Sequence, residues 1–450
     1  MTAAGSDRRE FWIAGGLALG LAVAVRIHNA FHYTSLWGFD ALYNWRYIEY
    51  LTRTWKLPAP DAGWSAAHPP LFYYASAALC RVLPLDPAAQ VIALRLCIAA
   101  AGLGMAGLTV RLVQRADPNN PRRALLAFGL VLFLPVHLYM SAMLSEEIVV
   151  AAFTTLVLAG AGSDLAAGRI LGWRRALWLG AAAGAALLTK LTGLLLIVAV
   201  AGAYLLDRWN RRNTATRAPL APVLWMAVIA SAVGGWFYVR NWIGWGYLYP
   251  HGLEVHQIMF SMPPGQREWL DYLRIPLATW SDPQVLNPDL LRSVWGSTYL
   301  TWWFDGHRAF LPTQTPLVSR LGSAILVLAL LPSAAAVAGA VRGVQRVLRG
   351  AAGPDALLTG LIGLSLAGYV AFTWRNPWFA TCKASFLLGL SLPFAYYASE
   401  TLDDWMRRDA RLRLALWCVL AALTALILFT FTSQEVFWSM DHMEKPGVVW

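Results

Sequence analysis

Residues 37–75 hold the side chains of this chain that are best suited to chemistry: an acid, several bases, many aromatic residues and a Pro-Pro pair. Asp40 is the first acid, and a carboxylate placed among aromatic residues can act as a general base. Because Asp is also a favoured N-cap, Asp40 could instead only begin a helix at Ala41. Tyr43 follows at helical spacing and is a candidate for substrate binding.

His68 stands directly before Pro69 and Pro70. Consecutive prolines stop a helix and force an extended approach, which points His68 into the loop. We expect His68 to bind substrate, although an isolated histidine is more often a hydrogen-bonded bystander.

A second group of acids lies at the junction of two apolar segments. Glu146 and Glu147 follow His137 closely, and paired acids at the end of a membrane helix are costly unless they face a polar cavity. Substrate binding by the two glutamates is one prediction, and a divalent metal ion held by His137 and Glu147 is another. The spacing matches no strong metal motif, so the acids could also lie in water as N-terminal charges of a helix.

Three cations occupy comparable positions near the ends of apolar segments. Lys190 interrupts ALLTKLTGLLLI, Arg240 is followed by Asn241, and Lys383 precedes another apolar run. Each cation could neutralise a phosphate, with Arg240 suited to bidentate contact, and Asn241 could contact the substrate. Interfacial anchoring of the same cations is the alternative. The stretch 302–308 adds aromatic platforms and charges suited to a sugar.

The remainder of the chain consists mainly of the apolar segments that must position these residues. Hydrophobic residues make up 58% of the 450 positions and charged residues 14%, against about a quarter charged in soluble domains. Runs such as 414–431 can cross a bilayer, which needs about 20 residues. We therefore predict an all-α polytopic membrane protein with about eleven transmembrane helices. They fall near 11–26, 88–110, 124–142, 147–163, 174–188, 190–206, 219–238, 319–341, 356–374, 384–400 and 414–431.

Arginine-rich connections between these segments predict the orientation of the helices. If the N-terminus is cytoplasmic, eleven spans place all of these connections on the cytoplasmic side, as the positive-inside rule requires. A further span at 70–83 would break this pattern, and that piece is also too short to cross, so we predict a helix at the outer interface. The connections are 111–123, 169–175, 207–217, 342–349 and 407–413.

This orientation leaves two long loops, 27–87 and 239–318, on the non-cytoplasmic side. Loops of this length in a compact protein are usually functional. The sequence predicts one transmembrane domain over 1–450, with interfacial helices in both loops and no separate soluble domain. The net charge of +11 is typical of basic loops that fix orientation and meet anionic lipid, so we expect a membrane partner and no nucleic acid.

The order of these motifs resembles that of the GT-C glycosyltransferases in the group that holds the protein O-mannosyltransferases and the lipid A aminoarabinose transferase. That fold is a membrane bundle whose first external loop carries the catalytic acid, followed by a Pro-Pro-Leu-aromatic motif. The matching pieces are Asp40, the Lys56-Leu57-Pro58 turn, 68–74 (HPPLFYY), 145–147 (SEE), 188–193 (LTKLTG), 236–241 (WFYVRN) with Gly246 and Pro250 after it, and Lys383.

The resemblance implies an inverting transfer of a sugar from a polyprenyl-phosphate donor to a protein, lipid or cell-envelope glycan. Asp40 would take the proton of the acceptor, while Arg240, Lys190 and Lys383 would hold the departing phosphate. Many relatives carry a second acid directly after the first, where this chain has Ala41.

The same resemblance implies a role for the second acid group and a location. Glu147, with Glu146 or His137, would bind the sugar, the acceptor or a divalent metal ion. The protein would lie in a bacterial inner membrane with its site on the periplasmic side.

Two other classes of function compete with a transferase. A transporter or flippase of a polyprenyl-linked glycan would need substrate contacts on both faces and commonly shows inverted repeats, which the sequence does not display. A non-catalytic scaffold of an envelope assembly would not depend on Asp40 or Arg240.

Overall fold

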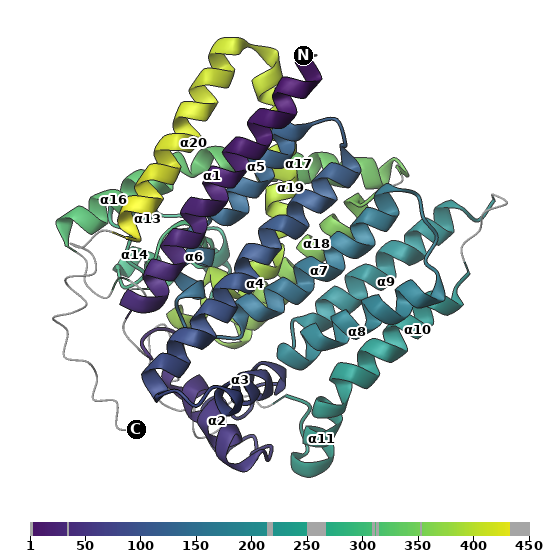
Figure 1. Cartoon of the computed structure of the whole chain (residues 1–450), viewed down its shortest axis with the longest axis vertical. Coiled ribbons are helices and arrows are strands. Elements are labelled where there is room, and N and C mark those ends of the chain that lie inside the picture. The colour runs from purple at the N-terminus through teal and green to yellow at the C-terminus, as the bar shows by residue number, and fades with distance from the viewer. Residues whose placement is uncertain are drawn as a thin grey trace.

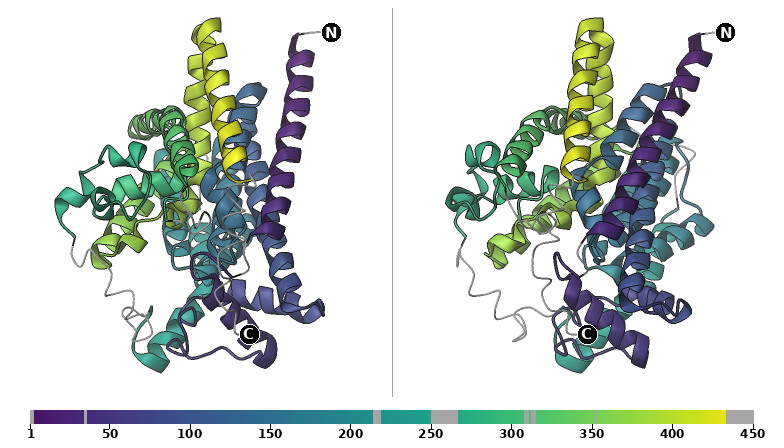
Figure 2. Two further views of the ribbon diagram at one scale, coloured as in Figure 1. Left: turned by 90° about the vertical axis from the view of Figure 1, so that its left-hand side faces the viewer. Right: turned by 60° about the vertical axis from the view of Figure 1, so that its left-hand side comes forward.

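The computed structural model describes residues 3–33, 36–213, 219–249, 267–307, 311, 315–351 and 353–432, and in these ranges every regular element is a helix (Figure 1). Long helices run side by side as a bundle in all three views (Figures 1 and 2). The predicted all-α polytopic fold is confirmed.

Nine helical segments in the described residues are long and apolar enough to cross a membrane, or ten if the bent pair α5 (Pro121–Leu132) and α6 (Pro135–Ser141) forms one span. The remaining predicted span, 174–188, is α8 (Trp173–Thr189), which is helical but has only 17 residues. At 1.5 Å per residue it extends for about 25 Å, somewhat less than the hydrocarbon core. The nine segments are Trp12–His32, Pro87–Ala116, Glu147–Ala166, Gly193–Asn210, Ala221–Trp245, Pro316–Leu348, Asp355–Arg375, Phe379–Arg408 and Ala410–Thr430.

These segments correspond to the labelled helices of the bundle. The single-helix segments are α1 (Ala3–His32), α4 (Pro87–Ala116), α7 (Glu147–Ala166), α9 (Gly193–Asn210), α18 (Asp355–Arg375) and α20 (Ala410–Thr430). The composite segments join α10 (Ala221–Ala230) to η1 (Ser231–Gly235) and α11 (Trp236–Trp245), α16 (Pro316–Leu328) to α17 (Leu330–Leu348), and η4 (Phe379–Thr381) and η5 (Ala384–Leu390) to α19 (Ser391–Arg408).

The bundle has two chemically different ends. Figures 1 and 2 place the start of α1 and the α19–α20 turn at one end, and the short helices α2 (Ala41–Thr54) and α3 (Leu71–Val82) together with α11 at the other. At the α19–α20 end, arginines from the basic connections pair with acids of α19. Arg122 contacts Asp403 at 2.5 Å, and Arg346 contacts Glu400 at 2.8 Å. These ion pairs tie α5 and α17 to α19.

The predicted interfacial helix at 70–83 is α3, an apolar helix of 12 residues. Such a helix extends for about 18 Å, too short to cross a bilayer. It packs beside α2, where Tyr47 stacks on Tyr73 with ring centroids 4.2 Å apart. The structure therefore agrees with the prediction from loop charge that residues 70–83 form a short helix and not a transmembrane span.

The predicted second loop, 239–318, differs from a simple external loop. Where described, it contains η3 (Trp269–Tyr272), α13 (Ala278–Ser281), α14 (Pro288–Leu291) and α15 (Val294–Trp303). Hydrogen bonds hold α15 against the bundle: Tyr139 donates to the Thr301 carbonyl at 2.6 Å, and Thr298 shares a 2.7 Å bond with Tyr369. The hydroxyl groups of α15 satisfy their hydrogen bonds within the protein, so this part of the loop packs as a bundle element.

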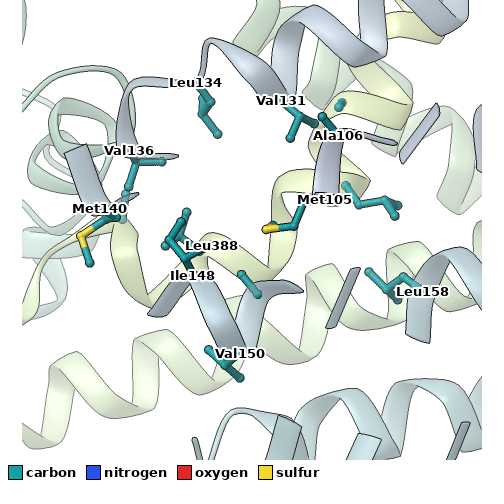
Figure 3. Close-up of a cluster of buried hydrophobic side chains, with 14 of the residues drawn as sticks. Met105, Ala106, Val131, Leu134, Val136, Met140, Ile148, Val150, Leu158 and Leu388 are labelled. Atoms are coloured by element: carbon teal, nitrogen blue, oxygen red, sulfur yellow. The ribbon is translucent and has the colours of Figure 1, made fainter. Parts of the chain in front are cut away.

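The apolar core fills the space between α4, α5, α6, α7 and η5 (Figure 3). Pro135 lacks a backbone N–H and so favours the break between α5 and α6, whose axes are bent by 46°. The buried guanidinium of Arg26 donates to the Leu132 carbonyl at 2.9 Å, at the end of α5. After this break the chain changes direction at Leu134 and continues through α6 to Glu146 and Glu147 at the start of α7.

Candidate active site

The turn between α1 and α2 holds Asp40 in a constrained position. Leu36 and Asp40 have positive φ angles of 59° and 52°, and Gly38 has 102°. A Cβ on Gly38 would lie 2.7 Å from the sulfur of Met143, so only glycine fits this close approach. Non-glycine residues in the left-handed region cost free energy and are common at functional sites.

Asp40 occupies the N-cap position of α2, but its side chain does not cap that helix. Instead the Trp64 indole N–H donates to Asp40 Oδ1 at 2.9 Å. The Asp40 carboxylate is therefore not a helix cap. Trp64 also stacks on Tyr43 at 5.3 Å, so Tyr43 lies one ring away from Asp40.

A buried group of charges lies at the start of α7. Lys190 Nζ contacts Glu147 Oε1 at 2.5 Å and Glu146 Oε1 at 3.4 Å. His68 Nδ1 lies 3.7 Å from the same Glu146 oxygen. The two acids are 4% and 5% exposed, so they do not lie in water as helix N-terminal charges.

Mutual attraction keeps Glu146 and Lys190 ionised. Burial alone raises the pKa of the Glu146 carboxyl, but the charges of Lys190 and His68 and the hydrogen bonds of the carboxylate together outweigh burial, so the net pKa lies below its usual range. Burial alone lowers the pKa of the Lys190 ammonium, but Glu147 and Glu146 together raise it above its ordinary value. Both groups are therefore charged at neutral pH.

We expect Glu147→Gln to lower the free energy of unfolding by about 3 kcal/mol, because it removes the closest partner of a buried ammonium. Lys190→Met should cost more, since it leaves two buried acids without their cation. The thermal midpoint of the purified protein in nanodiscs measures both effects.

The control is Glu49→Gln, which breaks an exposed pair with Arg53 of similar length, 2.6 Å. Exposed pairs contribute at most about 1 kcal/mol. Equal midpoints for Glu147→Gln and Glu49→Gln would show that the buried group does not support the fold.

Lys383 joins Asp40 to this charged group. Its ammonium lies 4.0 Å from the Phe39 ring centroid and 4.8 Å from that of Phe386, and Lys190 lies 4.9 Å from the same Phe386 ring. Phe39 directly precedes Asp40 in the chain, so Lys383 lies against the Asp40 turn. In the part of the chain that the structure describes, no acid comes within ion-pair distance of Lys383. Aromatic faces attract a cation without neutralising it, so this 8% exposed ammonium keeps an unmatched charge.

The stretch 302–308 reaches the site through His307. Its ring stacks on Phe379 at 6.1 Å and meets the Phe39 ring edge-on at 5.7 Å. Burial lowers the pKa of His307 to about 4, so the ring is neutral and donates from Nε2 to the Cys382 carbonyl at 3.2 Å. This histidine supports the wall beside Lys383, while Arg308 lies outside the described residues.

Arg240 and Asn241 lie at the edge of the site. Arg240 donates to the Pro58 carbonyl at 2.8 Å, packs over the Trp245 ring at 4.6 Å and donates to Asn241 at 3.2 Å. The guanidinium thereby holds the Lys56-Leu57-Pro58 turn against α11. Within the described ranges, its recorded contacts are with this turn and α11 and not with the acids of α7.

His137 is not placed with the acids. Its Nε2 shares a 2.7 Å hydrogen bond with Ser391, and the ring is fully buried in α6. Among the residues that are described, no three His, Cys, Asp or Glu side chains are grouped to hold a metal ion. The Lys190 ammonium contacts Glu147 Oε1, and the structure does not bring His137 and Glu147 together as a pair of metal ligands.

Three further residues belong to this site although they were not predicted. Asn44 is buried one turn after Asp40 on α2, and Phe386 lies between the two lysines. Tyr249 interacts electrostatically with Lys190 and the nearby acids. Helical spacing from Asp40 and from Lys383 could have indicated the first two, whereas no local signal marks Tyr249.

Comparisons with known proteins agree with this architecture. Residues 62–234 match the family model described as Dolichyl-phosphate-mannose-protein mannosyltransferase. The matched part contains His68, Glu146, Glu147 and Lys190, and the resemblance predicted from the motifs is confirmed. No curated protein sequence matches the chain significantly.

The fold is similar to that of the oligosaccharyltransferase of Archaeoglobus fulgidus. Its complex with Zn and sulfate gives a TM-score of 0.54 at 16% identity, covering 93% of this chain and 53% of that one. The apo form gives 0.51 at 14% identity, covering 94% and 56%. The chain thus has a GT-C-like helical fold and spans about half the length of these proteins.

A weaker likeness extends to ArnT from Cupriavidus metallidurans, solved bound to undecaprenyl phosphate. The TM-score is 0.42 at 16% identity, covering 91% of this chain and 81% of that one.

Proposed function

We propose that this protein transfers a sugar from a polyprenyl-phosphate donor to an acceptor, with inversion at the anomeric carbon. The observation that carries the proposal is a buried ammonium, with no acid partner among the described residues, over the ring of the residue next to the candidate base. Phe39 directly precedes Asp40, the N-cap residue of α2, and the Lys383 ammonium lies 4.0 Å from the Phe39 ring centroid. Inverting transfer needs a base and a cation in this relation, one for the acceptor proton and one for the leaving phosphate.

Asp40 is the proposed general base. The acceptor group attacks the anomeric carbon, its proton passes to Asp40, and the bond between that carbon and the phosphate oxygen breaks. Trp64 holds one carboxylate oxygen at 2.9 Å and so orients the group. The strained backbone at Asp40 adds to this preorganisation.

Lys383 is the proposed first contact of the departing phosphate. Negative charge grows on the phosphate as the sugar leaves, and a buried cation that no acid of the described residues neutralises stabilises that change. Lys190 carries the same charge but is already held by two acids, so we assign it to balancing them at the edge of the phosphate site. Arg240 would meet the phosphate from the α11 side, where it also holds the Pro58 turn.

The remaining polar residues would contact the sugar or the acceptor. His68 and Glu146 lie together at 3.7 Å, and Glu147 is one residue further on. Tyr43 and Trp64 present a stacked aromatic pair beside Asp40, and Asn241 is buried beside Arg240. Carboxylates and a histidine suit sugar hydroxyl groups, which both donate and accept hydrogen bonds.

The proposed location is a bacterial inner membrane, with the site on the periplasmic side. The support is the distribution of charge: arginine-rich connections gather away from α2 and α3, and basic loops remain in the cytoplasm. The acceptor would be a protein, a lipid or a cell-envelope glycan.

Mass spectrometry of envelope lipids and glycans, from cells with and without the gene, tests this function. Loss of one sugar decoration and accumulation of its polyprenyl-phosphate donor are expected. An unchanged set of decorations, with purified protein that consumes no polyprenyl-phosphate sugar, would contradict the proposal. Accumulation of the donor on one membrane face only would instead indicate a flippase.

A further inference from the structure

We infer that Asn44 is a positioning residue which, through Tyr73, keeps the ring proton of His68 on Nδ1, so that Nε2 is the hydrogen-bond acceptor of that ring. Asn44, Tyr73 and His68 form a chain of hydrogen bonds from α2 through α3 to the loop before it. The direction of each bond follows from the chemistry of its ends.

The first step is the orientation of the Asn44 amide. Asn44 is 1% exposed, and its Nδ2 lies 2.9 Å from the Leu144 carbonyl oxygen. A carbonyl oxygen only accepts, so this end of the amide must be the NH₂ group. The Asn44 oxygen therefore points the other way, where it accepts hydrogen bonds from Ser65 Oγ at 2.7 Å and from the Tyr73 hydroxyl at 2.9 Å.

The second step is the Tyr73 hydroxyl. Burial, and after it the negative charge of Glu146, raise the pKa of Tyr73 well above its ordinary value, so the phenol keeps its proton. That one proton is donated to Asn44. Toward His68 Nδ1, at 2.9 Å, the Tyr73 oxygen can therefore only accept.

The third step is the histidine. Its Nδ1 faces the Tyr73 oxygen and, at 3.7 Å, the ionised Glu146 carboxylate. Both neighbours accept, so Nδ1 carries the proton whether the ring is neutral or charged. In the neutral ring, Nε2 carries the lone pair, and any group that meets it must donate a hydrogen bond.

This inference sharpens the proposed function and, in its consequence for substrate, rests on it. A phosphate oxygen or a carboxylate would meet a lone pair at Nε2 and be disfavoured. A hydroxyl group of the sugar or the acceptor would be favoured, which separates the role of His68 from the phosphate role of Lys383. Asn44 acts through Tyr73 and need not touch the substrate.

Nitrogen NMR of the full-length protein in nanodiscs, with ¹⁵N-histidine incorporated, tests the inference directly. His68→Gln identifies the two ring resonances of His68 by their loss. Above the titration of the ring, we expect a protonated Nδ1 and an unprotonated Nε2. Tyr73→Phe should shift the Nδ1 resonance and increase the other tautomer, because it removes the nearer acceptor while keeping the ring.

Ser65→Ala is the matched control, since it removes the other hydrogen bond to the same Asn44 oxygen without interrupting the chain to His68. Its His68 resonances should superpose on those of the unmodified protein. An unprotonated Nδ1 in the unmodified protein, or no response to Tyr73→Phe, would overturn the inference. The spectra need no turnover, so a protein that shows this tautomer but transfers no sugar would overturn the proposed function alone.

Discussion

Asp40→Asn is expected to lower the rate of sugar transfer by about 10²–10⁴-fold, the usual contribution of a general base. The amide is nearly the same size as the carboxylate and can still accept from the Trp64 indole, but it cannot take the acceptor proton. The rate is measured with purified protein in liposomes that contain a polyprenyl-phosphate sugar and the acceptor identified from the envelope. The apparent affinity for the donor should change little, because Asp40 acts on the acceptor.

Asp61→Asn is the matched control, as it removes an exposed carboxylate from the same connection between α2 and α3. It should retain full activity. Asp40→Asn protein that is folded, with an unchanged thermal midpoint, and as active as Asp61→Asn would show that another group is the base.

Lys383→Met is expected to lower kcat/KM for the donor by about 10–150-fold, because a hydrogen bond to a charged group contributes about 1.5–3 kcal/mol. The methionine fills a similar volume between Phe39 and Phe386 but offers no charge to the phosphate. Initial rates at varied donor and varied acceptor concentrations separate the two substrates. Lys383→Arg should recover part of the activity, since it keeps the charge but spreads it over a larger group.

Arg53→Gln serves as the control for loss of one positive charge near the site end of the bundle, because Arg53 is exposed and pairs only with Glu49 among the contacts described. Its activity should remain unchanged. If Lys383→Met lowered kcat/KM for the acceptor but not for the donor, Lys383 would contact the acceptor and not the phosphate.

Much of the fold could be predicted from the sequence because membrane insertion depends on local composition. Each span is an apolar run long enough to cross the hydrocarbon core, and this property needs no knowledge of distant residues. Loop charge likewise separated the short helix α3 from the spans. Where the prediction differed, at α15, this helix is held by the hydroxyl groups of Tyr139 in α6 and Tyr369 in α18, two residues that lie far away in sequence.

The candidate site was only partly predictable. The individual residues Asp40, Glu147, Lys190 and Lys383 stood out because charged groups beside apolar runs are costly and require a purpose. The pairing of these residues could not be predicted. Lys190 lies 2.5 Å from Glu147, whereas Lys383 contacts aromatic rings and no acid among the described residues. Nothing in the sequence distinguishes the two lysines in this respect. The two lysines therefore appeared equivalent until their neighbours were known.

By itself, the sequence determined that this is a helical membrane protein with a group of acids and bases near helix ends, and that its motifs follow the GT-C order. Only the tertiary structure decided that the Asp40 carboxylate is turned away from its own helix toward Trp64, that Lys383 meets aromatic rings and no acid among the described residues, and that His137 bonds to Ser391. The physical reason is that composition acts locally on each helix, whereas the charge, tautomer and orientation of a buried group depend on what other helices place against it.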